Sequence, residues 1–519
     1  MSNHKSRSEN SIRNTFVGLF NKVITLLLSF IGRTIFIHLL GAEYLGVNAL
    51  FGNVLVVLSL ADLGIGSVMV YSFYKPIHWQ DERQICSLIS YYKKLCGGIA
   101  LAILCLGMLA LLFLDRMIIS DLPGRELRIF YLLFLLNLVF SYYATYKSAF
   151  INADQKIYIV NFYNTFFIII QNIVQILFLL ATRNYIIFLV IQAVCTLLNN
   201  VLISIKANKL YPFLRDRAPT VEFDKILIKR SLKSTFLCRI GSVMMNNTDN
   251  ILISIILGTV YAGYYSNYSL FIVNINTFIY IIVQALFSSL GNLNAGGDME
   301  KSCRIFYGLI LFFHWLSAFC SLCFLLVFND FISIWIGNEY LLGGSAVFAI
   351  VINFYIQNIV NPVWMFRESM GMFKEVTVVM LLSSVLNVAL SFLLGCFFGL
   401  FGILISPAVA RTVTTLWYEP YVLFKYKFHR STGPYYLKQA KYMVISGAAM
   451  LIAFYACRHL PVSLPHIFLK IGISLLAVST AFTVAAFRAE DFKILIHYAF
   501  KLRSKFRTAK RRETVESMD

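Results

Sequence analysis

Long runs of apolar residues constrain this chain more than any other feature of its sequence. A helix that crosses a bilayer needs about 20 consecutive apolar residues. The 519-residue sequence contains fourteen such runs, at residues 15–40, 45–74, 86–114, 127–149, 157–181, 184–206, 231–257, 260–290, 304–328, 343–366, 375–396, 400–424, 440–457 and 466–487. An open sheet cannot satisfy its backbone hydrogen bonds in lipid. The sequence therefore predicts an all-α polytopic membrane protein with about fourteen transmembrane helices.

The net charge of +20 is distributed as membrane topology requires. If the N-terminus is inside, 35 of the 45 Lys and Arg residues fall in inside segments, 5 in outside loops and 5 within spans. Basic residues concentrate in the cytoplasmic loops of membrane proteins. The bias therefore predicts that both termini are cytoplasmic, and it explains the charge without nucleic acid as a partner.

A polar stripe runs along the first apolar helix and recurs in the seventh. Its spacing of three or four residues puts the polar side chains on one helix face: Lys22, Thr25, Ser29 and Arg33. The matching positions, each 217 residues later, carry Arg239, Ser242, Asn246 and Asn250. An offset of 215–218 persists over more than 150 residues. The sequence therefore predicts two six-helix lobes that are parallel repeats.

The predicted organisation has six parts. They are a cytoplasmic leader (1–14), an N-lobe (15–206), a basic linker (207–230), a C-lobe (231–425), two further helices (440–487) and a basic cytoplasmic tail (488–519). Residues 329–340 carry Trp335 and Tyr340, which are side chains that suit a membrane interface. We expect this stretch to be a short amphipathic segment lying on the membrane.

Charged residues within spans are the leading functional candidates, because each costs about 2.5–3.5 kcal/mol at mid-bilayer. The sequence has no phosphate-binding loop, HExxH or GxSxG motif, and no long loop that could form a catalytic domain. We therefore expect a protein that is not an enzyme and needs no cofactor or metal. The cations proposed to bind an anion are Lys22, Arg33, Arg239 and Arg411, and the gate or counter-ion candidates are Asp62, Asp249 and Asn250.

Each candidate has a structural alternative. Lys22 and Arg239 could snorkel to the lipid headgroups. Arg33 could pair with Asp62 or Asp249, and an Arg33–Asp249 pair could hold an outer gate. Arg411 is balanced between a cavity and a helix contact, and His314 is expected to be a packing residue. Aromatic and amide side chains that could bind sugar, but also suit helix packing, are Asn48, Tyr265, Asn267, Tyr268 and Asn276.

The opening stretch, from RNTFVGLF to GIGSV, resembles the N-terminus of polysaccharide-repeat-unit (Wzx-type) flippases. These belong to the multidrug/oligosaccharidyl-lipid/polysaccharide (MOP) exporter superfamily. Residues 153–156 and 329–340 are also similar to segments of that family, and the resemblance covers roughly residues 12–425. It implies two six-helix lobes around a central cavity, often with two extra C-terminal helices.

The resemblance also implies a function. Such flippases move undecaprenyl-pyrophosphate-linked oligosaccharides from the inner to the outer leaflet of the bacterial plasma membrane by alternating access, for capsule, exopolysaccharide or O-antigen synthesis. Cavity cations would meet the pyrophosphate, a role that falls on Lys22, Arg33, Arg239 and Arg411. Candidate partners are the lipid-linked oligosaccharide, membrane lipids, a polysaccharide polymerase and glycosyltransferases.

Three alternatives stay open. A cation-coupled drug exporter of the MATE type has the same architecture but predicts an acidic cavity. A flippase for a lipid-linked peptidoglycan precursor shares the chemistry and differs in the sugar. A polysaccharide polymerase would need a large outside loop, whereas the outside loops here are short.

Overall fold

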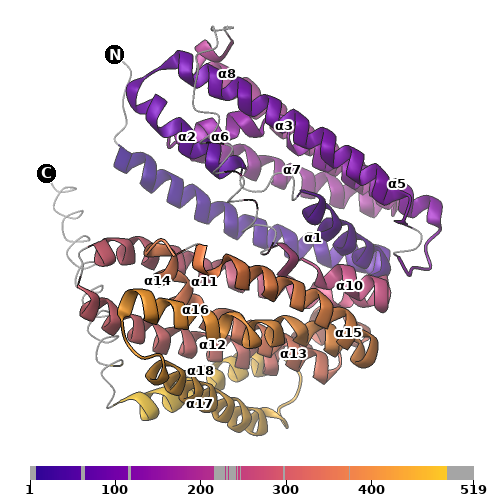
Figure 1. The fold of residues 1–519 in the computed structure, drawn as a ribbon. Helices are drawn as coiled ribbons and strands as arrows, with labels where there is room; N and C mark the ends of the chain where they lie inside the picture. Colours follow the sequence, from indigo (N-terminus) through magenta and orange to yellow (C-terminus); the bar gives the residue numbers. More distant parts are fainter. Residues whose placement is uncertain are drawn as a thin grey trace, which may run out of the picture. The chain divides into compact units, whose positions relative to one another are not determined.

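The computed structural model describes residues 7–59, 65–114, 118–215, 247–295, 298–372 and 374–487, with a few single positions between 228 and 245 and residue 492. The predicted all-α fold is confirmed, since these residues form helices and turns and contain no strand (Figure 1). Contacts divide the chain into two compact units, Met1–Ser266 and Asn267–Asp519, and each is described by itself. The predicted leader, linker and tail lie partly outside the described residues, and the lobe boundaries stay predictions.

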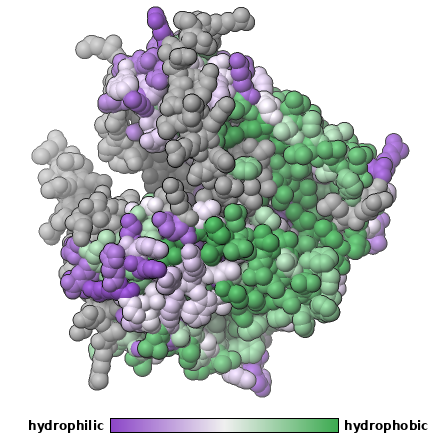
Figure 2. All heavy atoms as spheres, viewed as in Figure 1, coloured by the Kyte–Doolittle hydropathy of each residue, from purple (hydrophilic) through white to green (hydrophobic). Residues whose placement is uncertain are grey.

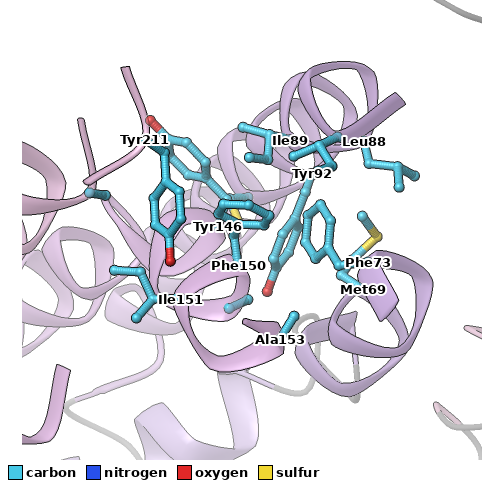
Figure 3. Packing of buried hydrophobic residues seen from close by; sticks show 14 of the residues in the cluster. Met69, Phe73, Leu88, Ile89, Tyr92, Tyr146, Phe150, Ile151, Ala153 and Tyr211 are labelled. Atoms are coloured by element: carbon cyan, nitrogen blue, oxygen red, sulfur yellow. The ribbon is translucent and has the colours of Figure 1, made fainter. Parts of the chain in front are cut away.

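The first unit is a bundle of long helices. Its helical elements are α1 (Arg7–Leu58), α2 (Ile65–Trp79), α3 (Glu82–Leu111), α5 (Gly124–Ser141), α6 (Thr145–Ala153), α7 (Ile157–Thr182), α8 (Tyr185–Leu210), η2 (Pro212–Arg215), α10 (Asp249–Ile256) and the start of α11 (Thr259–Ala295). Figure 3 shows the aromatic cluster that joins α2, α3 and α6, in which Phe73, Tyr92 and Phe150 are almost fully buried. Packing of this kind holds together helices that lipid alone would not associate.

The second unit contains the rest of the helices. They are the remainder of α11, α12 (Met299–Trp335), η3 (Asn338–Tyr340), α13 (Gly344–Ile359), α14 (Asn361–Ser369), α15 (Lys374–Val413), α16 (Thr415–Leu423), η4 (Phe424–Phe428), α17 (Gly433–Cys457) and α18 (Leu464–Ala486). Helices α17 and α18 pack on each other and on α12. Lys470 of α18 forms an ion pair with Asp330 of α12, which fixes the last helix to the unit.

Ten helices in the described part of the chain are long and apolar enough to cross a membrane, or eleven if α5 and α6 form one bent span. Two of these stretches contain breaks, at Gly41 and at Gly399, where the backbone leaves the helical conformation. The protein is therefore a multi-pass membrane protein, and the count of fourteen spans stays a prediction. Figure 2 shows hydrophobic residues over much of the visible surface, as lipid contact requires.

The prediction that residues 329–340 form a segment of their own is wrong, and their position relative to the membrane stays a prediction. Helix α12 continues through this stretch to Trp335, and only Asn338–Tyr340 forms a separate turn. Ile332 is fully buried and Tyr340 is 8% exposed, so the segment packs into the second unit. Trp335 and Tyr340 misled the sequence argument because aromatic side chains suit a protein core as well as an interface.

Two cations that the charge count placed in cytoplasmic loops are buried helix residues. Lys147 of α6 donates hydrogen bonds to Ser204 Oγ (2.7 Å) and Asn208 Oδ1 (2.8 Å) of α8. Arg367 of α14, only 2% exposed, forms ion pairs with Glu368 (3.0 Å) and with Glu419 of α16 (3.5 Å). These cations therefore join helices within a unit.

The predicted repeat appears as a helix crossing in the first unit. Gly41 and Gly258, at equivalent positions, both have positive φ, which glycine adopts without strain. Beyond these turns, the second half of α1 crosses the start of α11. A Cβ on Gly46 would lie 1.7 Å from the carbonyl oxygen of Thr259, and a Cβ on Gly263 would lie 2.2 Å from that of Ala42. Ala42 and Thr259 are themselves equivalent in the repeat. The two contacts, Gly46 with Thr259 and Gly263 with Ala42, are therefore related as in a two-fold interface.

We predict that Gly46→Ala or Gly263→Ala destabilises the protein, because the new methyl group forces the two backbones apart. The expected cost is about 1–3 kcal/mol, seen as a lower melting temperature of the protein in detergent. Gly52→Ala is the matched control on α1, since its Cβ would meet nothing within 4 Å. Equal melting temperatures for all three variants would show that the crossing is not tight.

Replacing Arg367 tests the ion pairs of the second unit. Arg367→Met leaves the buried Glu419 without its cation, so we expect a loss of about 3–5 kcal/mol in the free energy of unfolding. The double variant with Glu419→Gln should recover part of that loss. Arg304→Met, at an exposed position of α12, should leave unfolding unchanged. The measurement is the unfolding curve of the native protein, of Arg367→Met, of the double variant and of Arg304→Met. An Arg367→Met curve equal to the native one would contradict a stabilising role of the ion pair.

Candidate substrate cavity in the first unit

The first half of α1 and the middle parts of α7 and α8 line an open cavity of about 340 Å³ in the first unit. Helix α1 packs closely against α7: a Cβ on Gly32 would lie 3.0 Å from the side-chain oxygen of Asn172. This contact depends on the absence of a side chain at Gly32. Farther along, toward the start of α1, the helices leave room for the cavity.

The cavity wall combines one cation with neutral polar groups. It is lined by Lys22, Thr25, Asn164, Phe167, Ile168, Gln171, Cys195, Thr196 and Asn199, none of which is acidic. Asn199 Nδ2 donates to Asn164 Oδ1 (2.8 Å), which orients both amides. Asn199 Oδ1 is buried with no hydrogen-bond partner in the structure. The wall therefore offers an ammonium group, hydroxyls and amides to a bound molecule.

Lys22 differs from three buried cations that the helices carry, Lys147, Arg367 and Lys470. Its side chain is exposed to the cavity, and within the described part of the chain it has neither a carboxylate nor a hydrogen-bond partner. Lys147, Arg367 and Lys470 are each held by fixed protein acceptors. A cation in a helix bundle with no protein partner is available to an anion from outside.

Arg33 lies on α1 as predicted but does not line this cavity. Its guanidinium donates a hydrogen bond to Ser266 Oγ at the start of α11. The structure thus separates Lys22 from Arg33, which the stripe had placed on one helix face. The first half of α1 presents the two cations to different neighbours, α7 and α8 in one case and α11 in the other.

The gate candidates are partly described. Asp249 begins α10, is 8% exposed, and lies close enough to Tyr265 to act electrostatically on its hydroxyl. Asn250 Oδ1 is buried with no hydrogen-bond partner. Helix α1 contacts α10, and the proposed Arg33–Asp249 gate stays a prediction. Arg239 and Asp62 lie outside the described residues.

Several other candidates have protein partners. Asn48 accepts a hydrogen bond from Tyr185 of α8 (3.0 Å) in the first unit. In the second unit, Tyr268 donates to Asn329 (2.7 Å) and accepts from the Leu342 amide (2.9 Å). Asn276 accepts from Asn358 (3.1 Å), Arg411 donates to Asn353 (2.7 Å), and Asn267 is fully buried. These contacts orient neighbouring helices, and roles in substrate binding stay predictions.

His314 has the packing role that was expected. It is fully buried in α12, and its ring nitrogens contact Tyr355 of α13 (2.8 Å) and Gln439 of α17. Tyr355 also donates to Ser446 of α17 (2.9 Å). The network ties α17 to the second unit. Among the described residues, no group of three or more His, Cys, Asp or Glu side chains could hold a metal ion.

Sequence reasoning singled out Lys22 and Thr25 of α1 but not the residues of α7 and α8 around them. Asn164, Gln171 and Asn199 belong to a set of amides in two spans that could equally well have bonded to neighbouring helices. Nothing in their spacing shows that α7 and α8 aim these three at one lysine. The amide-rich composition of the two spans was the only available signal.

Compared by sequence, the chain matches no protein-family model and no curated protein. Its structure matches several solved transporters. The lipid II flippase MurJ in an inward closed conformation has a TM-score of 0.62 and 14% identity, covering 92% of this chain and 99% of that one. An inward-facing multidrug resistance MATE family transporter of the MOP superfamily has a TM-score of 0.60 and 15% sequence identity, and the match covers 78% of this chain and 96% of that one.

A MOP superfamily transporter from Pyrococcus furiosus, described as having a binding pocket of reverse polarity, has a TM-score of 0.50 and 14% sequence identity. The match covers 82% of this chain and 98% of that one. The chain has the fold of MOP-type transporters. At these identities the likeness establishes the fold, while the substrate has to be argued from the cavity itself.

The charge of the cavity can be measured with thiol reagents. In a cysteine-free chain carrying Thr196→Cys, we expect an anionic methanethiosulfonate to react faster than a cationic one, because Lys22 attracts the anion. The rate ratio should fall, on the order of tenfold, when Lys22→Gln is added. Lys94→Gln, at an exposed position of α3, is the matched control and should leave the ratio unchanged. If Lys22→Gln left the ratio of the two reaction rates unchanged, Lys22 would not set the charge of this cavity.

Proposed function

We propose that this protein is a flippase that moves polyprenyl-pyrophosphate-linked oligosaccharide repeat units from the inner to the outer leaflet. The observation that carries the proposal is Lys22, an ammonium group that has no partner among the described residues and lies in a cavity lined by amides and hydroxyls. A phosphate group presents several acceptor oxygens and negative charge, which such a wall can bind through charge-assisted hydrogen bonds. The fold shared with MurJ and other MOP-type transporters supports the transport class.

The size of the cavity assigns it to one part of the substrate. Pockets that enclose a drug-sized molecule have volumes of about 300–1,000 Å³, and this one measures about 340 Å³. It can hold a pyrophosphate with at most the first sugar. The rest of the oligosaccharide would occupy the central cavity that the fold implies, and the polyprenyl chain would stay in lipid.

Arg33, Arg239 and Arg411 are proposed as further cationic contacts along the path. Arg33 would exchange its Ser266 hydroxyl for a phosphate oxygen, and Arg411 would release Asn353 in the same way. Asp249, Asn250 and Asp62 are proposed as counter-ions or gate residues. Sugar contacts would come from Tyr265, Asn267 and the other predicted side chains when the helices rearrange.

The membrane potential supplies a driving force for this direction of transport. Moving negative charge outward across an inside-negative membrane gains about 2.3 kcal/mol per charge per 100 mV. The membrane potential therefore favours outward movement of the pyrophosphate. It also favours the return of the empty, positively charged cavity to the inward-facing state. We place the protein in the bacterial plasma membrane with both termini cytoplasmic, serving a polysaccharide polymerase and glycosyltransferases.

A flippase for a lipid-linked peptidoglycan precursor is the second candidate, and the MurJ-like structure favours it. MurJ, described as a lipid II flippase, covers more of this chain than the MATE transporter does, 92% against 78%. Rescue of a strain depleted of its own lipid II flippase would assign this substrate. The drug-exporter alternative predicts an acidic cavity, whereas none of the described residues that line the cavity in the first unit is acidic.

Replacing Lys22 tests the proposal in cells. In a strain that depends on this protein for surface polysaccharide, we expect Lys22→Gln to lower the polysaccharide at least tenfold, since one charged contact to phosphate contributes about 1.5–3 kcal/mol. Lys22→Arg should keep most of the activity, because it retains the charge. Quantitative immunoblots must show equal amounts of each variant in the membrane.

Lys94→Gln provides the matched loss of one positive charge outside the cavity and should behave as the native protein. If Lys22→Gln supports normal polysaccharide at normal protein levels, the lysine is a snorkelling residue and the proposal fails.

A further inference from the structure

An apolar groove of about 490 Å³ opens on the second unit between α15, α16 and α17. Leu382 and Val413 of α15 form one wall, with side chains 57% and 64% exposed. Trp417 and Tyr421 of α16 and Tyr436 of α17 form the other. In a membrane protein an apolar surface contacts lipid chains. A concave apolar surface such as this groove also favours a chain whose shape fits it.

The aromatic wall is held by contacts between its own residues. Tyr436 donates a hydrogen bond to the Trp417 carbonyl (2.5 Å), and the two ring centroids lie 4.7 Å apart. These contacts join α16 to α17, so the groove keeps its width without an occupant. A preformed groove binds a flexible chain at a lower cost in ordering than one that must first open.

A lysine stands at one end of the groove. Lys425 follows α16, and its Nζ donates to the hydroxyl of Tyr421, a groove residue, at 3.0 Å. The same ammonium lies 5.3 Å from the Tyr421 ring centroid and 5.5 Å from that of Tyr426. It is exposed and forms no ion pair within the described part of the chain. Two donor hydrogens therefore remain for an acceptor at the mouth of the groove.

We propose that this groove is a binding site for an anionic phospholipid. One acyl chain lies along Leu382, Val413 and the aromatic wall, and the lipid phosphate accepts from Lys425. An acyl chain gains little by leaving bulk lipid for an apolar groove. The preference for this lipid therefore comes from charge complementarity at Lys425. The positive-inside pattern places Lys425 on the cytoplasmic side, where anionic lipids concentrate.

This site goes beyond the proposed transport function and does not depend on it. It lies in the second unit, whereas the cavity with Lys22 lies in the first. The two can therefore fail or hold separately.

Trp417 provides a local probe of the groove. The full-length protein is placed in nanodiscs of phosphatidylcholine that contain increasing fractions of brominated phosphatidylglycerol or brominated phosphatidylcholine. The Trp417 signal is the fluorescence of the native protein minus that of Trp417→Phe. We expect phosphatidylglycerol to reach half-maximal quenching at a several-fold lower fraction than phosphatidylcholine.

Matched variants identify the groove and the charge. Lys425→Gln should make the two lipids equal, while Lys94→Gln should keep the preference. Leu382→Phe narrows the groove and should weaken quenching by both lipids. Leu393→Phe, on the same helix at an exposed position outside the groove, should not. Circular dichroism and size-exclusion profiles confirm that each variant is folded.

Three outcomes would overturn the proposal. The first is equal quenching by the two lipids in the native protein, and the second is a preference that survives Lys425→Gln. The third is displacement of brominated phosphatidylglycerol by a small fraction of polyprenyl phosphate in a Lys425-dependent manner, which would assign the groove to the polyprenyl chain.

Discussion

Every polar group that a helix carries into the bilayer needs a partner, and this structure depends on how that need is met. Arg367 is buried with two glutamates, Lys470 with Asp330, and Lys147 with a serine and an asparagine. Each pairing also joins two helices. Lys22 is the cation for which the described residues supply no partner, and the space beside it is a cavity. From this contrast we propose that Lys22 binds an anion and that the other three cations are structural.

The repeat in the sequence has a physical counterpart in the glycine crossing. Gly46 and Gly263 are equivalent residues. Gly46 approaches the backbone carbonyl of Thr259, and Gly263 approaches that of Ala42, which is the equivalent of Thr259. The loop near residue 119 also joins the two turns. The Ile119 carbonyl accepts from the Thr259 amide (3.0 Å), and Glu43 accepts from the Asp121 amide (2.7 Å).

The sequence predicted those parts of the fold that depend on a single segment. The length of the apolar runs predicted the helices, whereas the positive φ of Gly41 and Gly258 became evident only in the structure. The sequence did not predict which helix each polar residue faces. Lys22 and Arg33 share a helix face but contact different neighbours, because tertiary packing decides the environment of each. Likewise, Lys147 and Arg367 counted as loop cations, since charge alone does not show whether a short segment folds back into the bundle.

We propose that the cavity beside Lys22 receives the pyrophosphate of a lipid-linked oligosaccharide. The most direct measurement uses proteoliposomes that contain a synthetic polyprenyl-pyrophosphate oligosaccharide and, in parallel, an uncharged analogue with the same chain and sugar. Accessibility to an external lectin over time gives the rate of flipping. The account predicts that the native protein flips the pyrophosphate lipid much faster than the analogue and that Lys22→Gln removes the difference. Equal rates for the two lipids in the native protein would contradict it.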